Sequence, residues 1–340
     1  YEIGVRLVGS EMCIRDRNYY SKEITFDGQL GKIYNNAQLM GKIDLPTNIP
    51  TSFRFIASIS TFDYYKKDKL FSRNDKPSFN SKDERFVKLM VALPFLANKR
   101  AEFSLGYGQL EDNYFQSSVI DFDKDRSDRS TYKLLGGSIG FYGSTLNTRQ
   151  YATKGYLEKL IAQVFTGRER FEPGNPQEGY SPSPQERQSW LQISYMKEAY
   201  HTMGPKFTLG WMAEALYSSK NFSENYTATM MQAGEFAPTP HSKLMYNEAF
   251  RANQYVAAGI KPIYVLNDMF QFRTEFYGFT PIFPIKKNAL NKAYYGKAFS
   301  RFEYMGEVSV ICHLPFGAIS AYVNHYSSPR REWNVGMTIG

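Results

Sequence analysis

Residues 206–215 read KFTLGWMAEA, and their polarity changes at almost every position. Because successive side chains of a β-strand point to opposite sides, this run would have one apolar face and one small or polar face. The apolar face would carry Phe207, Leu209, Trp211, Ala213 and Ala215, and the other Lys206, Thr208, Gly210, Met212 and Glu214. Such a strand is typical of a transmembrane β-barrel, in which one face meets lipid and the other a polar lumen.

The same alternation recurs along the chain. Phe103, Leu105 and Tyr107 alternate with Glu102, Ser104, Gly106 and Gly108, and Trp333, Val335, Met337 and Ile339 alternate with Asn334, Gly336, Thr338 and Gly340. Period-two patterning predicts strands near 29–44, 52–66, 84–97, 100–112, 130–145, 155–170, 186–199, 204–219, 256–266, 269–284, 297–313, 316–327 and 331–340, with a further strand over 19–27. We therefore predict an all-β, antiparallel transmembrane barrel with thirteen or fourteen strands present.

The predicted connections alternate in length. Pro46–Thr51, Asn98–Lys99, His201–Gly204 and Asn267–Asp268 are short, whereas Asp68–Asp83, Asn113–Arg129, Phe171–Gln185 and Ile285–Gly296 are long, and 220–255 is the longest. Outer-membrane barrels have short periplasmic turns and long outer loops. We expect the loops near Asp75, Asp125 and Gly179 to face outward, and the turns near Asn48, Lys99 and Asp268 to face the periplasm.

Composition supports a barrel over a helical membrane protein. The mean hydropathy is −0.46, and the longest nearly uncharged apolar run, Leu89–Ala97, is well short of the roughly 18–20 residues of a spanning helix. Aromatic residues nevertheless make up 16% of the chain, as expected where aromatic girdles mark two membrane interfaces. The alternative is a soluble all-β protein.

Several functional classes find no support in the sequence. The net charge is +8, but the basic residues are scattered among acids and form no stripe for a phosphate backbone, so we expect no nucleic-acid partner. Two cysteines, Cys13 and Cys312, and four histidines without ligand spacing predict no metal site, and we expect no cofactor.

Residues 1–17, YEIGVRLVGSEMCIRDR, are set apart from the rest. They lack the apolar core of a signal peptide, and Met12–Arg17 resembles the translation of a transposon end used in preparing sequencing libraries. We expect 1–17 to be non-native and 18–340 to be one outer-membrane barrel domain that lacks its first strands.

One motif suggests catalysis. Gly136-Gly137-Ser138-Ile139-Gly140 matches the Gly-x-Ser-x-Gly nucleophile elbow, which needs a strand, a sharp turn and a helix. Phe141–Thr145 instead continues a strand pattern, so we predict no catalytic residues. The glycines would keep the lumen face small where another group packs closely.

A group of carboxylates falls on the predicted lumen face. Paired carboxylates can perform acid–base chemistry, but charged lumen residues are also ordinary in barrels, and we favour the structural interpretation. The group comprises Glu102, Glu214, Glu275, Glu303 and Glu307.

A family resemblance rests on residues 144–156, STLNTRQYATKGY. Their Asn147, Arg149, Thr153 and Gly155 resemble a turn of the BamA-type (bacterial surface antigen) outer-membrane barrels, which have Pro where this chain has Ala152. Within that superfamily the chain is similar to the barrel of Bacteroidetes-type patatin-like phospholipases, in Tyr226–Thr229, Pro238–His241, Asn247–Tyr255 and Arg273–Phe279.

The resemblance implies a sixteen-strand barrel whose long sixth loop, here 220–255, enters and plugs the lumen. In the family an arginine of that loop meets acidic lumen residues, and Arg251 is the matching position. The implied structural salt bridge joins Arg251 to Glu275, with Glu303 or Glu307 nearby. The alternative is that Arg251 lies in a solvated loop tip.

The function implied is that of a bacterial outer-membrane barrel that anchors or exports an upstream patatin-like hydrolase. This chain would itself be no enzyme. The alternatives are a BamA-type factor that assembles other barrels and, less favoured, a diffusion pore. Expected partners are outer-membrane lipids and the upstream hydrolase or periplasmic domains of the same protein, and a homodimer is left open.

Overall fold

The computed structural model describes residues 21–31, 34–64, 80–96, 98–116, 125–175, 187–315, 317–328 and 333–339 of the 340-residue chain. The predicted non-native segment 1–17 and the loop positions Asp75 and Gly179 lie outside these residues.

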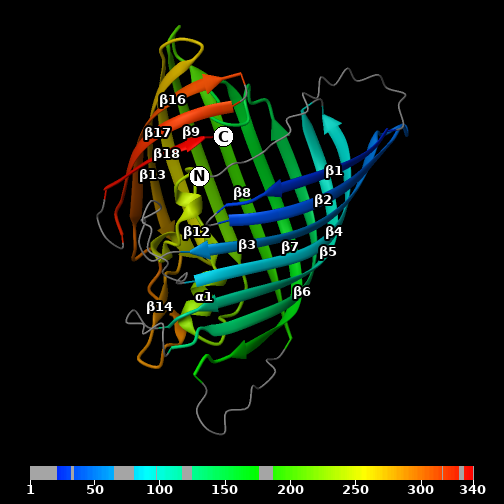
Figure 1. Cartoon of the computed structure of the whole chain (residues 1–340), viewed down its shortest axis with the longest axis vertical. Helices are drawn as coiled ribbons and strands as arrows, with labels where there is room; N and C mark the ends of the chain where they lie inside the picture. Colours follow the sequence, from blue (N-terminus) through cyan, green and yellow to red (C-terminus); the bar gives the residue numbers. More distant parts are fainter. Residues whose placement is uncertain are drawn as a thin grey trace. The chain divides into compact units, whose positions relative to one another are not determined.

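Fourteen strands run in chain order through one antiparallel sheet, each hydrogen-bonded to its neighbours in sequence (Figure 1). They are β1 (Ser21–Gln29), β2 (Tyr34–Leu45), β3 (Thr51–Tyr64), β4 (Asn80–Leu96), β5 (Lys99–Tyr114), β6 (Asp128–Ser144), β7 (Gly155–Glu172), β8 (Gln188–Thr202), β9 (Phe207–Ser218), β12 (Gln254–Val265), β13 (Phe270–Pro281), β16 (Glu303–Leu314), β17 (Gly317–Tyr326) and β18 (Trp333–Ile339). The predicted all-β class is confirmed, and each predicted strand, including the one near 19–27, overlaps a strand of the sheet. Closure of the sheet and a sixteen-strand count stay predictions.

The chain divides into two compact units. Unit 1 contains β1–β5, most of β6 and β7 and the first residues of β8, and unit 2 contains residues 142–161 and 192–340.

In unit 1 the strands show the predicted two faces. Phe55, Leu89 and Leu105 are cross-strand neighbours on β3, β4 and β5, and all three are exposed. On the other face Glu102 is buried and forms ion pairs with Arg54, at 3.6 Å, and Arg100, at 2.7 Å. The apolar side chains therefore lie on the exposed face and the charges on the sheltered one, the reverse of a soluble protein.

Unit 2 shows the same inversion more strongly. Exposed and buried side chains alternate along β13. Phe272 and Phe276 are exposed, whereas Arg273, Glu275 and Tyr277 point to the other face and are buried. The strand face that carries these buried side chains is the polar face of unit 2.

Short turns link the strands at one end. At the β12–β13 turn, the Asn267 side chain accepts hydrogen bonds from the backbone N–H groups of Met269 and Phe270, at 3.0 and 2.8 Å. Asparagine is favoured in tight turns because its side chain can replace a backbone acceptor.

The long loop, residues 219–253 between β9 and β12, has structure of its own. It contains helix α1 (Tyr226–Gln232), two 3₁₀ turns (Ser242–Leu244 and Glu248–Phe250) and a two-stranded ladder of β10 (Gly234–Glu235) and β11 (Arg251–Ala252). Asn225 caps α1 by accepting from the Ala228 N–H at 2.9 Å. Among the described residues, no helix is long and apolar enough to cross a membrane.

The long loop packs onto the polar face of unit 2. Phe236, Ala249 and Phe250 of the loop form one buried cluster with strand residues, among them Tyr255 and Phe279. The Phe236 ring stacks on that of Phe279 with centroids 5.9 Å apart. These aromatic side chains thus form an apolar contact between the long loop and a face that is otherwise polar.

The last long connection also departs from the sequence prediction. Strands predicted to end at 284 and to begin at 297 instead end at Pro281 and begin at Glu303. Between them a hairpin forms from β14 (Ile285–Lys287) and β15 (Ala293–Tyr295). Pro284 and Gly296 flank this hairpin, and both residues disfavour the interior of a regular strand.

Candidate functional site

The β6–β7 turn is built by the residues that carry the family resemblance. The Asn147 side-chain oxygen accepts from the N–H groups of Thr153 and Lys154, at 3.0 and 3.1 Å, and its amide donates to the Thr153 hydroxyl at 3.1 Å. Arg149 is exposed. Asn147 and Thr153 therefore close the turn.

Gly155 ends this turn in a conformation that other residues rarely adopt. Its φ is +89°, and a Cβ added there would lie 2.1 Å from the Thr145 carbonyl oxygen. Glycine is needed because it alone has neither the Cβ nor the cost of a positive φ. Asn147, Thr153 and Gly155 of the motif therefore stabilise the conformation of the turn itself.

The tip of the turn reaches distant strands of unit 2. The Tyr151 hydroxyl donates to Ser320 on β17 at 2.7 Å and lies 3.3 Å from the Thr338 hydroxyl on β18. The Tyr151 and Ala152 carbonyls accept from Gln271, at 3.2 Å, and Arg273, at 3.0 Å. Residues 151–152 therefore attach the turn to the polar face of unit 2 through hydrogen bonds.

A buried network of charged and phenolic side chains lies on this face. Lys261 of β12 pairs with Glu198 of β8 at 2.9 Å, and the Tyr200 hydroxyl also donates to Glu198. Arg273 donates to Tyr200 at 3.3 Å and to Glu275 at 3.1 Å. Each of these charged side chains contacts an opposite charge or a hydroxyl group, because a buried charge without such a partner is unfavourable.

Arg251 is buried but has a partner that the sequence did not predict. Its guanidinium donates to Glu235 at 2.6 Å and to the Met231 carbonyl at 3.2 Å. Glu235 and Arg251 are direct cross-strand partners in the β10–β11 ladder. The alternative that Arg251 lies in a solvated loop tip is therefore wrong. The acid that pairs with Arg251 comes from the same loop.

The three predicted acids are buried, and two of them form ion pairs with other arginines. Glu275 forms its ion pair with Arg273, two residues earlier on the same strand, and accepts from the Tyr277 hydroxyl at 2.6 Å. Glu303 pairs with Arg301 at 2.8 Å. Glu307 is buried directly opposite Glu275 in the β13–β16 register.

The predicted Arg251–Glu275 pair is therefore corrected to two separate pairs, Arg251–Glu235 and Arg273–Glu275. The β10–β11 register places Glu235 opposite Arg251, and Arg273 and Glu275 are two residues apart on one strand. Alternation alone could have found Arg273, because it shares a face with Glu275. No sequence pattern pointed to Glu235, because strands of two residues inside a loop are too short to show an alternation.

His241 is the titratable group that docks the loop on β17. Its Nδ1 lies 2.9 Å from the Tyr326 hydroxyl, and its ring packs against the rings of Tyr322 and Tyr326. Burial among these rings lowers the pKa of His241 to about 4, because the charged imidazolium loses its hydration there. The imidazole is therefore neutral at physiological pH.

Ser138 lies in a strand, as predicted. β6 continues through it to Ser144, and the Ser138 Oγ lies 2.6 Å from the Ser104 Oγ on β5. Within the described part of the chain, no histidine or carboxylate forms a hydrogen bond with Ser138. The neighbouring Gly136 makes room for Phe165, whose ring would lie 2.6 Å from an added Cβ, so the glycine does serve close packing.

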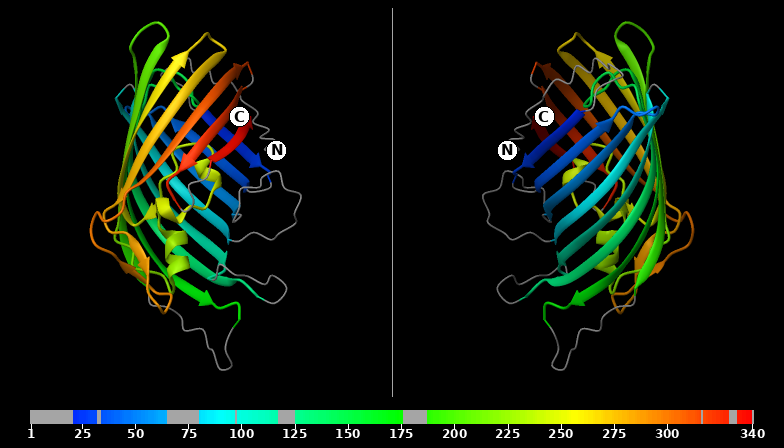
Figure 2. Two further views of the ribbon diagram at one scale, coloured as in Figure 1. Left: turned by 90° about the vertical axis from the view of Figure 1, so that its left-hand side faces the viewer. Right: turned by 90° about the vertical axis from the view of Figure 1, so that its right-hand side faces the viewer.

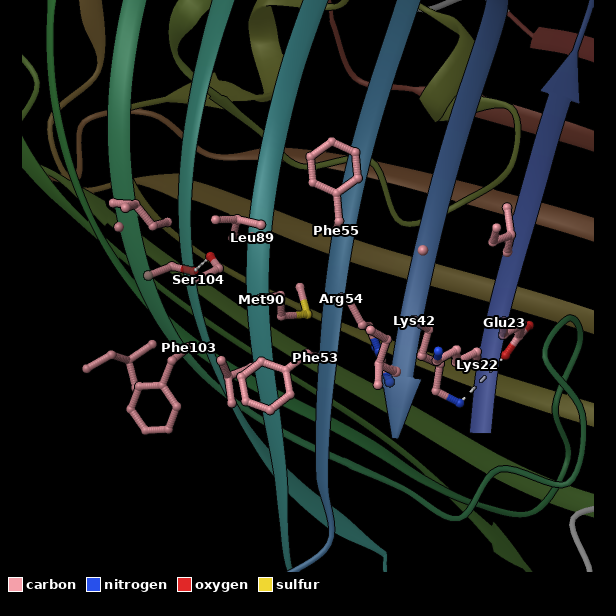
Figure 3. A pocket seen from close by; sticks show the side chains of 18 of the residues that line it. Lys22, Glu23, Lys42, Phe53, Arg54, Phe55, Leu89, Met90, Phe103 and Ser104 are labelled. Carbon is pink, nitrogen blue, oxygen red and sulfur yellow. Dashed lines mark hydrogen bonds and ion pairs between the residues drawn. The ribbon is translucent and has the colours of Figure 1, made fainter. Parts of the chain in front are cut away.

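A groove of about 1050 Å³ crosses unit 1 (Figure 3). Exposed apolar side chains line it, including Phe53, Phe55, Leu89 and Phe103. Lys42 and Arg54 also border it. A groove with this lining suits hydrocarbon chains better than a polar substrate.

No family model and no curated protein matches this chain. Among solved structures it is similar to BamA from Haemophilus ducreyi lacking POTRA domains 1-3, with a TM-score of 0.60, 10% identity, and coverage of 93% of this chain and 64% of that one. It also matches CdiB from Acinetobacter baumannii, with a TM-score of 0.48, 9% identity and coverage of 93% and 52%. The ferric preacinetobactin receptor BauA from the same organism matches with a TM-score of 0.45, 11% identity and coverage of 92% and 50%.

This chain therefore spans less than two thirds of the BamA chain that it resembles. The BamA match agrees with the predicted outer-membrane location. At 10% identity it bears on the fold alone, and this chain shares with BamA the fold of its antiparallel β-sheet.

Proposed function

We propose that this chain is the membrane-embedded part of a Gram-negative outer-membrane protein, and that it anchors or exports a patatin-like hydrolase domain encoded upstream. The observation that carries the first half is the inverted arrangement of the strands, with apolar side chains exposed and charges buried. Only a hydrocarbon environment makes that arrangement favourable, because about 25 cal/mol is lost for each Å² of apolar surface left in water.

The filling of the polar face supports an anchor over a diffusion pore. In unit 2 the long loop covers this face through the Phe236 cluster, and the β6–β7 turn reaches it through Tyr151. A pore needs a continuous polar path, whereas these segments occupy the polar face with packed side chains.

Catalysis would reside outside this chain. Ser138 has a strand context and a serine as its hydrogen-bonding neighbour, and among the described residues no base is hydrogen-bonded to it that could activate a serine nucleophile. The partners proposed are therefore outer-membrane lipids and the upstream hydrolase, with a homodimer as a further arrangement.

The second candidate is a BamA-type assembly factor. It is favoured by the fold similarity to BamA, at a TM-score of 0.60. The two candidates differ in what precedes the barrel: a strand–turn–helix Gly-x-Ser-x-Gly elbow with a later Asp-Gly pair for a patatin-like hydrolase, or repeated small periplasmic domains for the assembly factor.

The test begins with recovery of the 5′ end of the gene and expression of the full-length protein in a Gram-negative host. We expect phospholipase activity in the outer-membrane fraction, and its release into the soluble fraction when residues 21–339 are deleted. Activity that stays membrane-bound after this deletion would refute the anchor. Periplasmic repeats upstream, with loss of other barrels on depletion, would establish the second candidate instead.

The proposed absence of catalysis has its own test. The refolded chain should hydrolyse neither short acyl esters nor phospholipids. Hydrolysis that disappears in Ser138→Ala, with Ser104→Ala as the matched control, would overturn this part of the proposal.

A further inference from the structure

The β14–β15 hairpin has two unlike faces. Ile285 and Ala293 pack against Met230 and Ala233 of the helix α1 region. Lys286 and Tyr294 are direct cross-strand partners, and both are exposed. Figure 2 shows the hairpin, drawn in orange, beyond the end of β13. One face is therefore held by the long loop and the other is presented outward.

The outward face of the hairpin carries positive charge, and no acid among the described residues forms an ion pair with the lysines on this face. A Cβ added at Gly296 would lie 2.8 Å from Lys286 Cε, so the Lys286 stem crosses the residue next to Lys297. Both lysines are exposed, and within the described residues neither has a carboxylate at ion-pair distance. Their basic neighbours differ: Lys292 pairs with Glu224, and Arg301 pairs with Glu303.

Two phenylalanines extend this face. Phe299 has a φ of +52°, and its backbone N–H is held by the Ile282 carbonyl at 2.9 Å. Its ring is 63% exposed and Phe302 is 66% exposed. A positive φ is unusual for a bulky residue and costs on the order of a few kcal/mol. A strained backbone that presents a large ring to the outside indicates an external contact for that ring.

The position of Phe302 shows which environment the rings would meet. Its ring lies about 3.0 Å from where a Cβ would stand on Gly278, at the loop end of the exposed face of β13. That face carries Phe276, and its neighbour β16 carries the exposed Tyr304. Phe302 thus continues the apolar face of the strands, and Phe299 follows Lys297 by two residues in the same connection.

We propose that Lys286, Tyr294, Lys297, Phe299 and Phe302 form a binding surface for the phosphorylated headgroups of outer-leaflet lipids. The two ammonium groups bind phosphate oxygens, and such charge-assisted contacts are among the stronger hydrogen bonds. The rings enter the boundary between headgroups and acyl chains, where aromatic side chains concentrate. This inference rests on the proposed outer-membrane function, and the hairpin's place on a long connection puts it at the outer leaflet.

Binding is measured on the full chain folded in nonionic detergent micelles, with bisphosphorylated lipid A and fully dephosphorylated lipid A as probes. Two lysines at a membrane surface each contribute about fivefold, so we expect a preference of at least about tenfold for the phosphorylated probe. Lys286→Gln with Lys297→Gln should remove that preference. Phe299→Ser should weaken binding of both probes by a similar factor.

The matched control is Lys154→Gln with Lys206→Gln, two exposed lysines at the short-turn end of unit 2. This control should keep the preference. A control that loses as much as the hairpin variant would reduce the effect to net charge and overturn the proposal, as would a hairpin variant that keeps the full preference. Effective competition by inorganic phosphate alone would make this a soluble-anion site and overturn the lipid assignment.

Folding of every variant is checked by heat-dependent electrophoretic mobility. Because micelles do not require insertion into a bilayer, the two proposals can fail separately. A chain that prefers the phosphorylated probe but does not insert into bilayers would refute the proposed function. A chain that inserts but shows no preference would refute the hairpin surface.

Discussion

Gly155 is held at a φ of +89° against the carbonyl of Thr145. Gly155→Ala should lower the free energy of unfolding by about 1–3 kcal/mol, because a side chain is strained at this φ and the added Cβ would collide with backbone. Gly41→Ala is the control, since nothing lies within 4 Å of its added Cβ. Denaturant titrations in micelles would compare the two. Equal stability of both variants would contradict the constraint assigned to the turn.

Arg251 provides a second prediction about single residues. Arg251→Ala should destabilise the long loop by about 2–4 kcal/mol, since removing one partner leaves Glu235 without its cation in a partly buried site. Glu235→Ala should cost at least as much, because the charge that it leaves without its acid, Arg251, is the more deeply buried of the two. The double variant should cost clearly less than the sum of the singles.

A double-mutant cycle between Arg251 and Glu275 is the control. The ion pair of Glu275 is with Arg273, so the Arg251 and Glu275 effects should be close to additive. Strong coupling between Arg251 and Glu275 would restore the pairing expected from the sequence and contradict the observed one.

At the scale of elements, the long loop is docked on β17 partly through His241, and this makes the docking sensitive to pH. The folded pKa of about 4 lies below the ordinary value of about 6.5. Between these values the undocked loop gains a proton that the docked loop does not. Docking should therefore be unaffected above pH 6.5, weaken as the pH falls toward 4, and lose at most about 3 kcal/mol.

Hydrogen exchange of the loop amides at several pH values would measure this effect. His241→Gln should remove the part of the pH dependence that His241 causes, and His201→Gln, at the exposed end of β8, should not. Burial raises the pKa of Glu248 in the same loop, which acts in the opposite direction. The difference between wild type and His241→Gln isolates the histidine. Identical profiles for these two proteins would contradict the assignment.

Elements with a strict period were predictable, and elements stabilised by packing were not. The run from Phe207 to Tyr217 alternates residue by residue, so β9 follows from side-chain direction alone. Helix α1 is seven residues long and owes its stability to burial of Met230 and Met231, which no local pattern encodes. The β14–β15 hairpin likewise depends on its contact with α1.

The same division applies to the candidate site. The burial of Glu275, Glu303 and Glu307 followed from alternation. Long-range pairs did not, because a pair such as Lys261–Glu198 joins residues 63 positions apart on strands that are not neighbours in the sheet. Asn147 and Gly155 were located through a resemblance, and their hydrogen bonds and φ supply the physical reason.

At the scale of the whole molecule, the alternation of connection lengths predicts a membrane topology. Single cysteines would be introduced into a full-length protein with Cys312 replaced by serine. A membrane-impermeant reagent should label Asp125→Cys on intact cells. Positions Asn48, Lys99 and Asp268 should react only after the outer membrane is permeabilised. Labelling of Lys99→Cys but not Asp125→Cys on intact cells would invert the topology.

The contact of Tyr151 with Thr338 joins residues 187 positions apart. Contacts so distant in sequence close large loops of chain and are slow to form, in contrast to the Arg251–Glu235 pair, which spans 16 positions. During biogenesis the turn that carries Tyr151 is synthesised long before its partner. Its hydroxyl can contact Thr338 only after β18 has been made and placed. Quenching or protection at Tyr151 would therefore report the placement of β18, and a chain stalled before β18 would leave that phenol without its Thr338 contact.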